Sequence, residues 1–284
     1  MKHIINIILT AFCVLLTAQA IAQVEVRVQP QRREFLLGEN VSLNVRIDNF
    51  TDRAVTFTNI PGRSWLHFTV TRSGEQHPIS PKVIPNFPKL TVAAGSSRVV
   101  PVNLRPYFTF NRDGVYKVVA TVRMPDMQNT FSSNRASFTL AQGGKVRSFT
   151  VQSRGNTLNM SVRLMRVDGK DCLFGQVVNA DSQSVLGACY MGQFLNFMKP
   201  RVVLDSAQNL HVLCQSTPEY FTYSMMDNRG QRRDYKVMKR TGGPVDLVSS
   251  GGSIRAIGLR PYVRPTSTSE GVIHTTADRP GSVR

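Results

Sequence analysis

The sequence predicts an all-β protein with two β domains and a disordered C-terminal tail. β-Branched and aromatic residues are plentiful and alternate with polar residues, which is typical of half-buried strands. Long patterns of period 3.6, which would indicate amphipathic helices, are absent. We expect an immunoglobulin-like β-sandwich over residues 23–143, blade-like four-stranded β-meanders over 144–258 and a disordered tail over 259–284.

The first 22 residues have the features of a secretory signal peptide. Lys2 precedes an apolar run over residues 4–16, which is too short to span a bilayer. We expect cleavage after Ala22, with Ala20 as the second choice, because small residues occupy the positions that signal peptidase requires. The chain is therefore predicted to be periplasmic or secreted, and no other stretch is apolar enough for a transmembrane segment.

The first predicted domain consists of short alternating strands separated by turns. The clearest pattern is the alternation of Val41, Leu43, Val45 and Ile47 with polar residues, which predicts a strand with one buried face. The strands expected in order are VEVRVQP, which Pro30 ends, then VSLNVRID, AVTFT, SWLHFTV, SSRVVPVNL, VYKVVATVRM and RASFTLA. Short strands with turns about every ten residues are typical of a sandwich.

Two aromatic residues make this domain resemble a bacterial immunoglobulin-like domain. Trp65 lies on the third or fourth strand, where such sandwiches often bury a tryptophan. Tyr116 follows Asp113 and Gly114 in a pattern that resembles a tyrosine corner. The resemblance covers about 120 residues without the inter-sheet disulfide, and it implies a fold but no activity. A buried position for Trp65 is favoured over an exposed platform for sugar stacking.

The second predicted domain contains an apparent repeat. Residues 200–213, PRVVLDSAQNLHVL, align without gaps on residues 244–257, PVDLVSSGGSIRAI. With the hairpins expected over CLFGQVVNADSQSVLGACYMG and YFTYSMMDNRGQRRDYKVM, each unit resembles a β-propeller blade. About two and a half such units fit the domain, fewer than the four of a propeller. An open stack, a small sandwich and an incomplete propeller completed by a partner are all compatible, and we favour two or three meanders packed face to face.

The net charge of +17 is spread evenly along the sequence. Residues 24–143 and residues 144–258 each carry 15 Lys and Arg and 8 Asp and Glu. This spread does not indicate a specific nucleic-acid patch, because such a patch concentrates its cations. It is compatible with a solvated basic surface or with attraction to an anionic polysaccharide or another envelope component through charge alone.

The cysteines and histidines do not form a recognisable metal site. Cys172, Cys189 and Cys214 remain after processing, so at most one internal disulfide can form, and the sequence does not choose its partners. No CxxC or HxxxH spacing indicates zinc, and we expect neither a metal nor another cofactor. The oligomeric state is not determined by the sequence.

We predict that the protein is not an enzyme. GxSxG, P-loop, HExxH and dinucleotide signatures are absent. His211 is favoured as a structural or solvent-facing residue, because His67, His77 and His274 are far from it in the sequence. The segment GACYMG around Cys189 resembles the nucleophile segment of a cysteine protease, but no matching helix pattern follows it. The acidic candidates for a glycosidase pair lie in turn contexts: Asp52, Asp113, Asp168, Asp205 and Asp227.

The leading hypothesis is a non-catalytic exported envelope protein that acts in binding, adhesion or scaffolding, with anionic glycans among the expected ligands. The alternative is an accessory or catalytic subunit of extracytoplasmic polysaccharide degradation. A third hypothesis is a periplasmic chaperone-like sandwich that presents an unpaired edge strand to a client.

Overall fold

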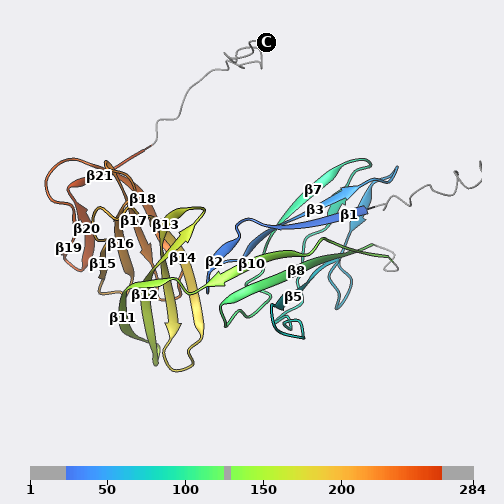
Figure 1. Ribbon diagram of the computed structural model, residues 1–284, viewed down its shortest axis with the longest axis horizontal. Coiled ribbons are helices and arrows are strands. Elements are labelled where there is room, and N and C mark those ends of the chain that lie inside the picture. The colour runs from blue at the N-terminus through green and yellow to red at the C-terminus, as the bar shows by residue number, and fades with distance from the viewer. Residues whose placement is uncertain (1–23, 125–128, 264–284) are drawn as a thin grey trace, which may run out of the picture.

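The computed structural model describes residues 24–124 and 129–263, and the described chain forms two β lobes. The signal peptide predicted over residues 1–22 lies outside the described residues. The first lobe, residues 24–141, contains ten strands (Figure 1): β1 (Val24–Pro30), β2 (Glu34–Leu36), β3 (Ser42–Asn49), β4 (Val55–Phe57), β5 (Leu66–Arg72), β6 (Leu90–Val92), β7 (Ser97–Asn103), β8 (Gly114–Arg123), β9 (Thr130–Ser132) and β10 (Ala136–Ala141).

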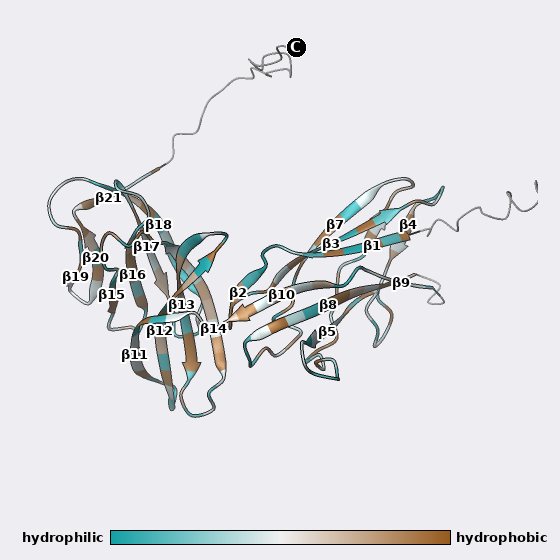
Figure 2. Cartoon of the chain, in the orientation of Figure 1, coloured by the Kyte–Doolittle hydropathy of each residue, from teal (hydrophilic) through white to brown (hydrophobic). Residues whose placement is uncertain are grey.

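Two sheets enclose the core of the first lobe. One has the order β1-β3-β7, and the other has the order β2-β10-β8-β5 with β9 paired to β8; β4 and β6 form a separate ribbon. Val41, Leu43, Val45 and Ile47 are fully buried, which confirms the expected alternation. Figure 2 shows hydrophobic and polar residues alternating along the strands of this lobe. The sequence did not indicate β2, β6 or β9, whose three residues each give only a weak periodic pattern; β4 is equally short, but its alternation in AVTFT was recognised.

The tyrosine corner and the buried tryptophan are both present. The Tyr116 hydroxyl donates a hydrogen bond to the Arg112 carbonyl at 2.5 Å and ties β8 to the loop before it. Trp65 is 1% exposed, and its indole nitrogen donates to the Pro88 carbonyl at 3.2 Å. Burial of the ring excludes Trp65 as a platform for sugar stacking.

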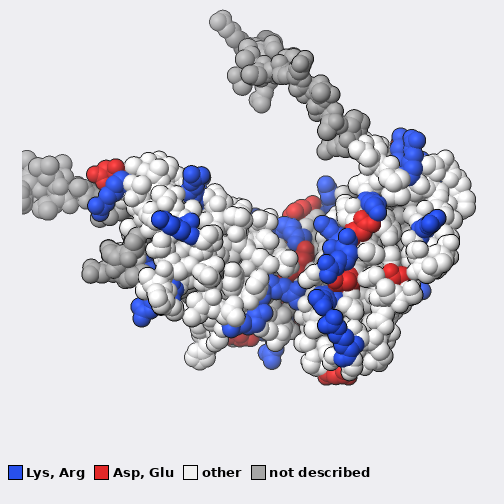
Figure 3. Space-filling model, turned by 180° about the vertical axis from the view of Figure 1, so that it is seen from behind, with Lys and Arg blue, Asp and Glu red and all other residues white. Residues whose placement is uncertain are grey.

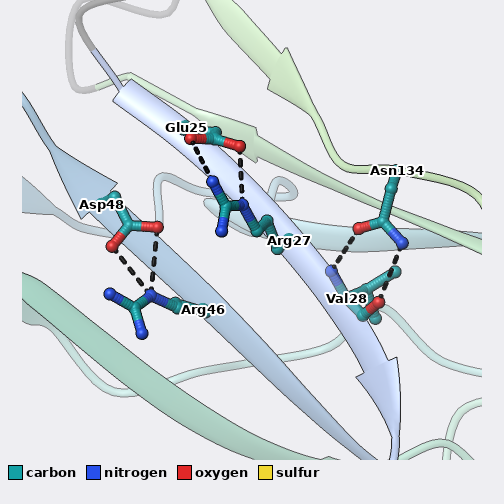
Figure 4. Close-up of polar contacts among 6 residues, drawn as sticks. All are labelled: Glu25, Arg27, Val28, Arg46, Asp48 and Asn134. Atoms are coloured by element: carbon teal, nitrogen blue, oxygen red, sulfur yellow. Dashed lines mark hydrogen bonds and ion pairs between the residues drawn. The ribbon is translucent and has the colours of Figure 1, made fainter.

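At Val28 the outer edge of β1 is capped by a side chain rather than by another strand. The Val28 amide donates to Oδ1 of Asn134 at 2.9 Å, and Nδ2 of Asn134 donates to the Val28 carbonyl at 3.1 Å. Figure 4 shows this amide lying against the strand as a neighbouring peptide would. The capped groups are not available to pair with another chain at this position. The same view shows two ion pairs on the surface of the sheet, Arg27–Glu25 and Arg46–Asp48.

The second lobe consists of stacked antiparallel layers. Its strands are β11 (Gly144–Ser153), β12 (Asn156–Val167), β13 (Lys170–Asn179), β14 (Val185–Gln193), β15 (Arg201–Leu204), β16 (Leu210–Gln215), β17 (Tyr220–Met226), β18 (Arg232–Arg240), β19 (Asp246–Ser250), β20 (Ser253–Ile257) and β21 (Leu259–Pro261). Strands β11–β14 form one meander, β15–β18 form a second with β21 at its edge, and β19–β20 form a hairpin. This arrangement matches the predicted stack of two or three meanders, but the expected units were divided wrongly, because β13–β14 belong to a sheet with β11–β12 and β15–β16 belong to a sheet with β17–β18.

Two hydrophobic clusters hold the layers together, and the β15–β18 layer lies between them. One cluster joins the two meanders through residues such as Met160, Val162, Val212 and Met226. The other lies on the opposite side of the β15–β18 layer and includes Leu213, Phe221 and Leu247. All six residues of β16 are consequently buried.

The gapless repeat predicted from the sequence is wrong, although both of its segments are hairpins. In the first hairpin Val203 faces His211, so a 44-residue offset would place Leu247 opposite Arg255, whereas Leu247 faces Ala256. The connections differ: the last pair is Leu204–Leu210 in the first hairpin, but Ser250–Ser253 across a two-glycine turn in the second. A shorter turn changes the register, and a shift of one residue reverses the faces of one strand relative to its partner. Among the positions expected to match, Leu247 is buried but Val203 is only partly buried.

The boundary predicted at residue 258 is also wrong. Residues 259–261 were expected in the tail, but they form β21, where Leu259 pairs with Arg240 of β18. Residues 264–284 of the predicted tail lie outside the described residues. Within the described chain, Cys172, Cys189 and Cys214 are all free thiols, and no helix is long and apolar enough to cross a membrane.

Candidate functional site

The two lobes dock through the turn that follows β2. Leu36 is fully buried against the outer face of the first meander, in a cluster with Met165, Cys172 and Phe174. The side-chain amide of Gln176 donates to the Leu37 carbonyl at 2.8 Å. An apolar contact and a hydrogen bond therefore fix the first lobe on β12 and β13.

Gly38 allows the two backbones to approach at this junction. The Ala188 amide donates to the Gly38 carbonyl at 2.9 Å. Gly38 has φ of 95°, and a Cβ there would lie 2.3 Å from a methyl carbon of Val185. Only glycine adopts this φ without strain and also leaves room for the Val185 methyl group. Arg105 adds a further link, because its guanidinium donates to the Leu186 carbonyl at 2.6 Å.

Beside this contact the lobes enclose a polar pocket of about 350 Å³, hereafter the interlobe pocket. It is lined from both lobes, and its floor is formed by polar residues of β11, β12 and β13: Lys145, Ser148, Asn159, Ser161, Arg163 and Gln176. No Asp or Glu occurs among the described residues that line it. A pocket at a junction of domains, with several converging polar groups, is the usual position of a small-ligand site.

The floor is polar because β12 has two different faces. Met160 and Val162 face the core between the two meanders, whereas Asn159, Ser161 and Arg163 face the first lobe. Ser161 is only 4% exposed, so its hydroxyl is withdrawn from bulk solvent although it lines the pocket. A hydrogen bond offered from such a desolvated hydroxyl contributes to specificity as well as to affinity.

Arg163 is the most unusual residue of the interlobe pocket. Burial lowers the pKa of its guanidinium from the ordinary value, although arginine remains charged. Its Nη1 donates to the carbonyls of Gln142 and Gly143 at 3.3 and 3.4 Å. Its Nε is buried and has no hydrogen-bond partner among the described residues. A buried donor without an acceptor is costly, so an acceptor atom of a ligand would relieve that cost.

His211, the histidine considered in the sequence, belongs to a buried hydrogen-bonded chain instead. Its Nε2 lies 3.0 Å from a carboxylate oxygen of Asp205, and its Nδ1 lies 2.7 Å from the Tyr223 hydroxyl. The Asn209 amide also donates to Asp205, at 2.7 Å. Both ring nitrogens thus have protein partners and His211 is only 3% exposed, which supports the structural alternative expected from the sequence and excludes the solvent-facing one.

None of the other chemical candidates lines the interlobe pocket. Burial raises the pKa of Cys189 to about 12, the reverse of what a nucleophilic thiol requires. The candidate carboxylates lie in five different connections between strands: Asp52, Asp113, Asp168, Asp205 and Asp227. Over the described ranges, no group of three His, Cys, Asp or Glu is arranged to hold a metal ion.

Basic side chains gather at the junction although they are spread evenly along the sequence. Figure 3 shows Lys and Arg concentrated where the two lobes meet and on the adjoining face of the second lobe. A hollow of about 420 Å³ between the lobes is lined by Arg33 and Arg166 but also by Glu34 and Asp168, so the excess of cations lies on the surface around it. Folding therefore creates a local basic surface that the sequence did not reveal.

The fold and the pocket define a class of protein: a β-sandwich docked on stacked β-meanders, with a polar, cationic pocket between them. No protein-family model matches the chain, and a comparison with curated proteins found no similar sequence. No residue of this pocket was singled out from the sequence; the alternation of Asn159, Ser161 and Arg163 with apolar residues in β12 is the pattern that could have indicated a polar face there.

Proposed function

We propose that the protein is a non-catalytic, exported binding protein whose interlobe pocket holds a segment of an anionic glycan. The observation that carries the proposal is the combination of buried hydrogen-bonding side chains with Lys145 and Arg163, without a carboxylate, in one pocket. Hydroxyl and amide groups can donate to and accept from sugar hydroxyls, and the two cations favour a carboxylate or sulfate substituent.

The size and the surroundings of the pocket support this ligand class. A volume of about 350 Å³ lies at the low end of the range for small-ligand sites, roughly 300–1,000 Å³, which suits a short sugar segment. The basic surface around the junction would attract the rest of an acidic chain and raise its association rate. Binding would therefore combine a local site with the charge-only attraction that the sequence indicated.

Degradation of the glycan is less well supported. Hydrolysis of a glycosidic bond uses two carboxyl groups roughly 5–10 Å apart. The described residues that line the interlobe pocket include none. We therefore assign binding rather than catalysis to this site, and incubation of an acidic glycan with the protein should release no new reducing ends.

The test is calorimetric titration of the full exported chain with an oligogalacturonate, with an uncharged malto-oligosaccharide as the comparison. We expect Arg163→Gln to weaken oligogalacturonate binding roughly tenfold or more, since a hydrogen bond to a charged group contributes about 1.5–3 kcal/mol. The matched control is Lys117→Gln, which removes one positive charge from an exposed position of β8. Equal weakening by both substitutions would mean that charge alone drives binding, and a preference for the uncharged oligosaccharide would refute the proposal.

A further inference from the structure

A second pocket lies in the first lobe, beside the edge strand β5. It has a volume of about 190 Å³ and shares no lining residue with the interlobe pocket. The residues on which the argument rests are Arg63, His67, Phe68, Ile84, Phe108 and Arg123. We call it the β5 pocket.

One wall of the β5 pocket is apolar. Phe68 and Phe108 belong to the lobe's core and are 6% and 1% exposed, so they are held rigidly by packing. Ile84 projects from the loop between β5 and β6 and is 61% exposed. An exposed large apolar side chain beside a pocket provides area that a ligand can cover.

The other wall carries nitrogen atoms that lack partners. Nδ1 of His67 and Nε of Arg123 are both buried, and neither has a hydrogen-bond partner among the described residues. His67 pairs with Thr121 across the β5–β8 ladder, and Arg123 lies two residues further along on the same face of the sheet. The ladder therefore places two unsatisfied polar groups next to each other at one pocket.

The charge of the β5 pocket favours an anion. Arg63 and Arg123 line it, and no Asp or Glu occurs among its described lining residues. Burial, together with the charge of Arg123, lowers the pKa of His67 from its ordinary value. His67 is therefore neutral at neutral pH, and it can donate one hydrogen bond without adding a third positive charge.

We propose that the β5 pocket binds a small organic carboxylate, with its oxygens on Arg123 and His67 and its apolar body against Phe68, Phe108 and Ile84. An inorganic anion would satisfy the nitrogens but would leave the apolar wall uncovered. A neutral apolar molecule would cover the wall but would leave the arginine without an acceptor. Only a ligand with both parts satisfies both walls.

The experiment is an NMR titration of the full exported chain with phenylacetate, and phenylacetamide serves as its uncharged isostere. We expect saturable binding of phenylacetate and at least roughly tenfold weaker binding of phenylacetamide, because a charge-assisted hydrogen bond is lost. Arg123→Gln should weaken phenylacetate binding to the same extent. Arg98→Gln, an exposed substitution on β7 with the same change of charge, should leave it unaltered.

A second variant keeps the test decisive if Arg123→Gln unfolds. Ile84→Asn changes only an exposed loop side chain, and it should weaken phenylacetate binding without altering oligogalacturonate binding. The proposal is overturned if phenylacetamide binds as well as phenylacetate, if inorganic phosphate displaces phenylacetate at equal concentration, or if Ile84→Asn has no effect. The two pockets share no lining residue. A negative result with phenylacetate therefore does not bear on glycan binding in the interlobe pocket, and a negative result with oligogalacturonate does not bear on the β5 pocket.

Discussion

The two lobes bury their β-sheets in different ways. In the first lobe each sheet has one face in the core, so β8 buries Val118, Ala120 and Val122 and leaves the intervening positions more exposed. In the second lobe the β15–β18 layer is covered on both faces, and β16 buries every residue, including the polar His211. One-sided burial requires only alternation, whereas two-sided burial also requires partners for the polar groups it encloses.

The lobes also differ in how closely their layers approach. The first lobe fills the space between its sheets with aromatic rings, among them Tyr116 and Phe138, which are stacked on the neighbouring strands β8 and β10 with centroids 5.5 Å apart. In the second lobe backbones nearly touch, and a Cβ added at Gly187 would lie 2.2 Å from the Arg229 carbonyl oxygen. An added methyl group at a layer contact of the second lobe should therefore lower the free energy of unfolding more than the loss of one hydrogen bond in the first lobe.

The largest effect is expected from Gly187→Ala. The added methyl group would overlap the backbone of Arg229 and Gly230, which cannot move aside as a flexible side chain could. Overpacking of this kind costs about 1–3 kcal/mol or more. Urea unfolding monitored by circular dichroism measures the loss. Gly144→Ala is the matched control, because its nearest atom would be 3.8 Å away, and a similar loss there would contradict the layer contact.

A moderate effect is expected from Tyr116→Phe in the first lobe. The substitution removes the hydrogen bond to the Arg112 carbonyl but keeps the ring stacked on Phe138. We expect a loss of about 1 kcal/mol in the free energy of unfolding, visible as a lower thermal midpoint. Tyr235→Phe, at a 39% exposed position, should change the midpoint little. Equal midpoints for wild type and Tyr116→Phe would show that the corner adds no stability.

The smallest effect is expected from the buried chain at Asp205, and it depends on pH. Burial raises the pKa of Asp205, but hydrogen bonds from Asn209 and His211 outweigh burial and hold the pKa below its ordinary value of 3.8. Since the folded pKa lies below the unfolded one, this stabilisation is complete above about pH 5 and is lost as the pH falls below about 4.

Asp205→Asn should therefore lower stability at pH 7, and the difference from wild type should shrink below about pH 4. Urea titrations across this range measure the difference, and Asp52→Asn in an exposed turn serves as the control. A difference that grows on acidification would mean that the hydrogen bonds to Asp205 do not contribute as described.

Much of the first lobe could be predicted because its signals are local. The alternation around Val45, the position of Trp65 and the spacing before Tyr116 each depend on a few neighbouring residues, and the structure confirms all three. Strand β2 could not be predicted from three residues, because it is held by parallel pairing with the distant β10. The turn after β2 also docks the lobes. The interlobe pocket therefore depends on the same long-range pairing and could not be predicted from the sequence.

The sequence by itself determined the β class, the strands with one buried face and the turns between successive hairpins, because alternation and turn chemistry operate over a few residues. The tertiary structure alone decided the register of the hairpin at Leu247, the partners of His211 and the convergence of Arg163 with the polar floor of the interlobe pocket. Each of these depends on which layers pack together and on the length of a turn. A shift of one residue, which composition does not reveal, reverses the faces on which such side chains lie.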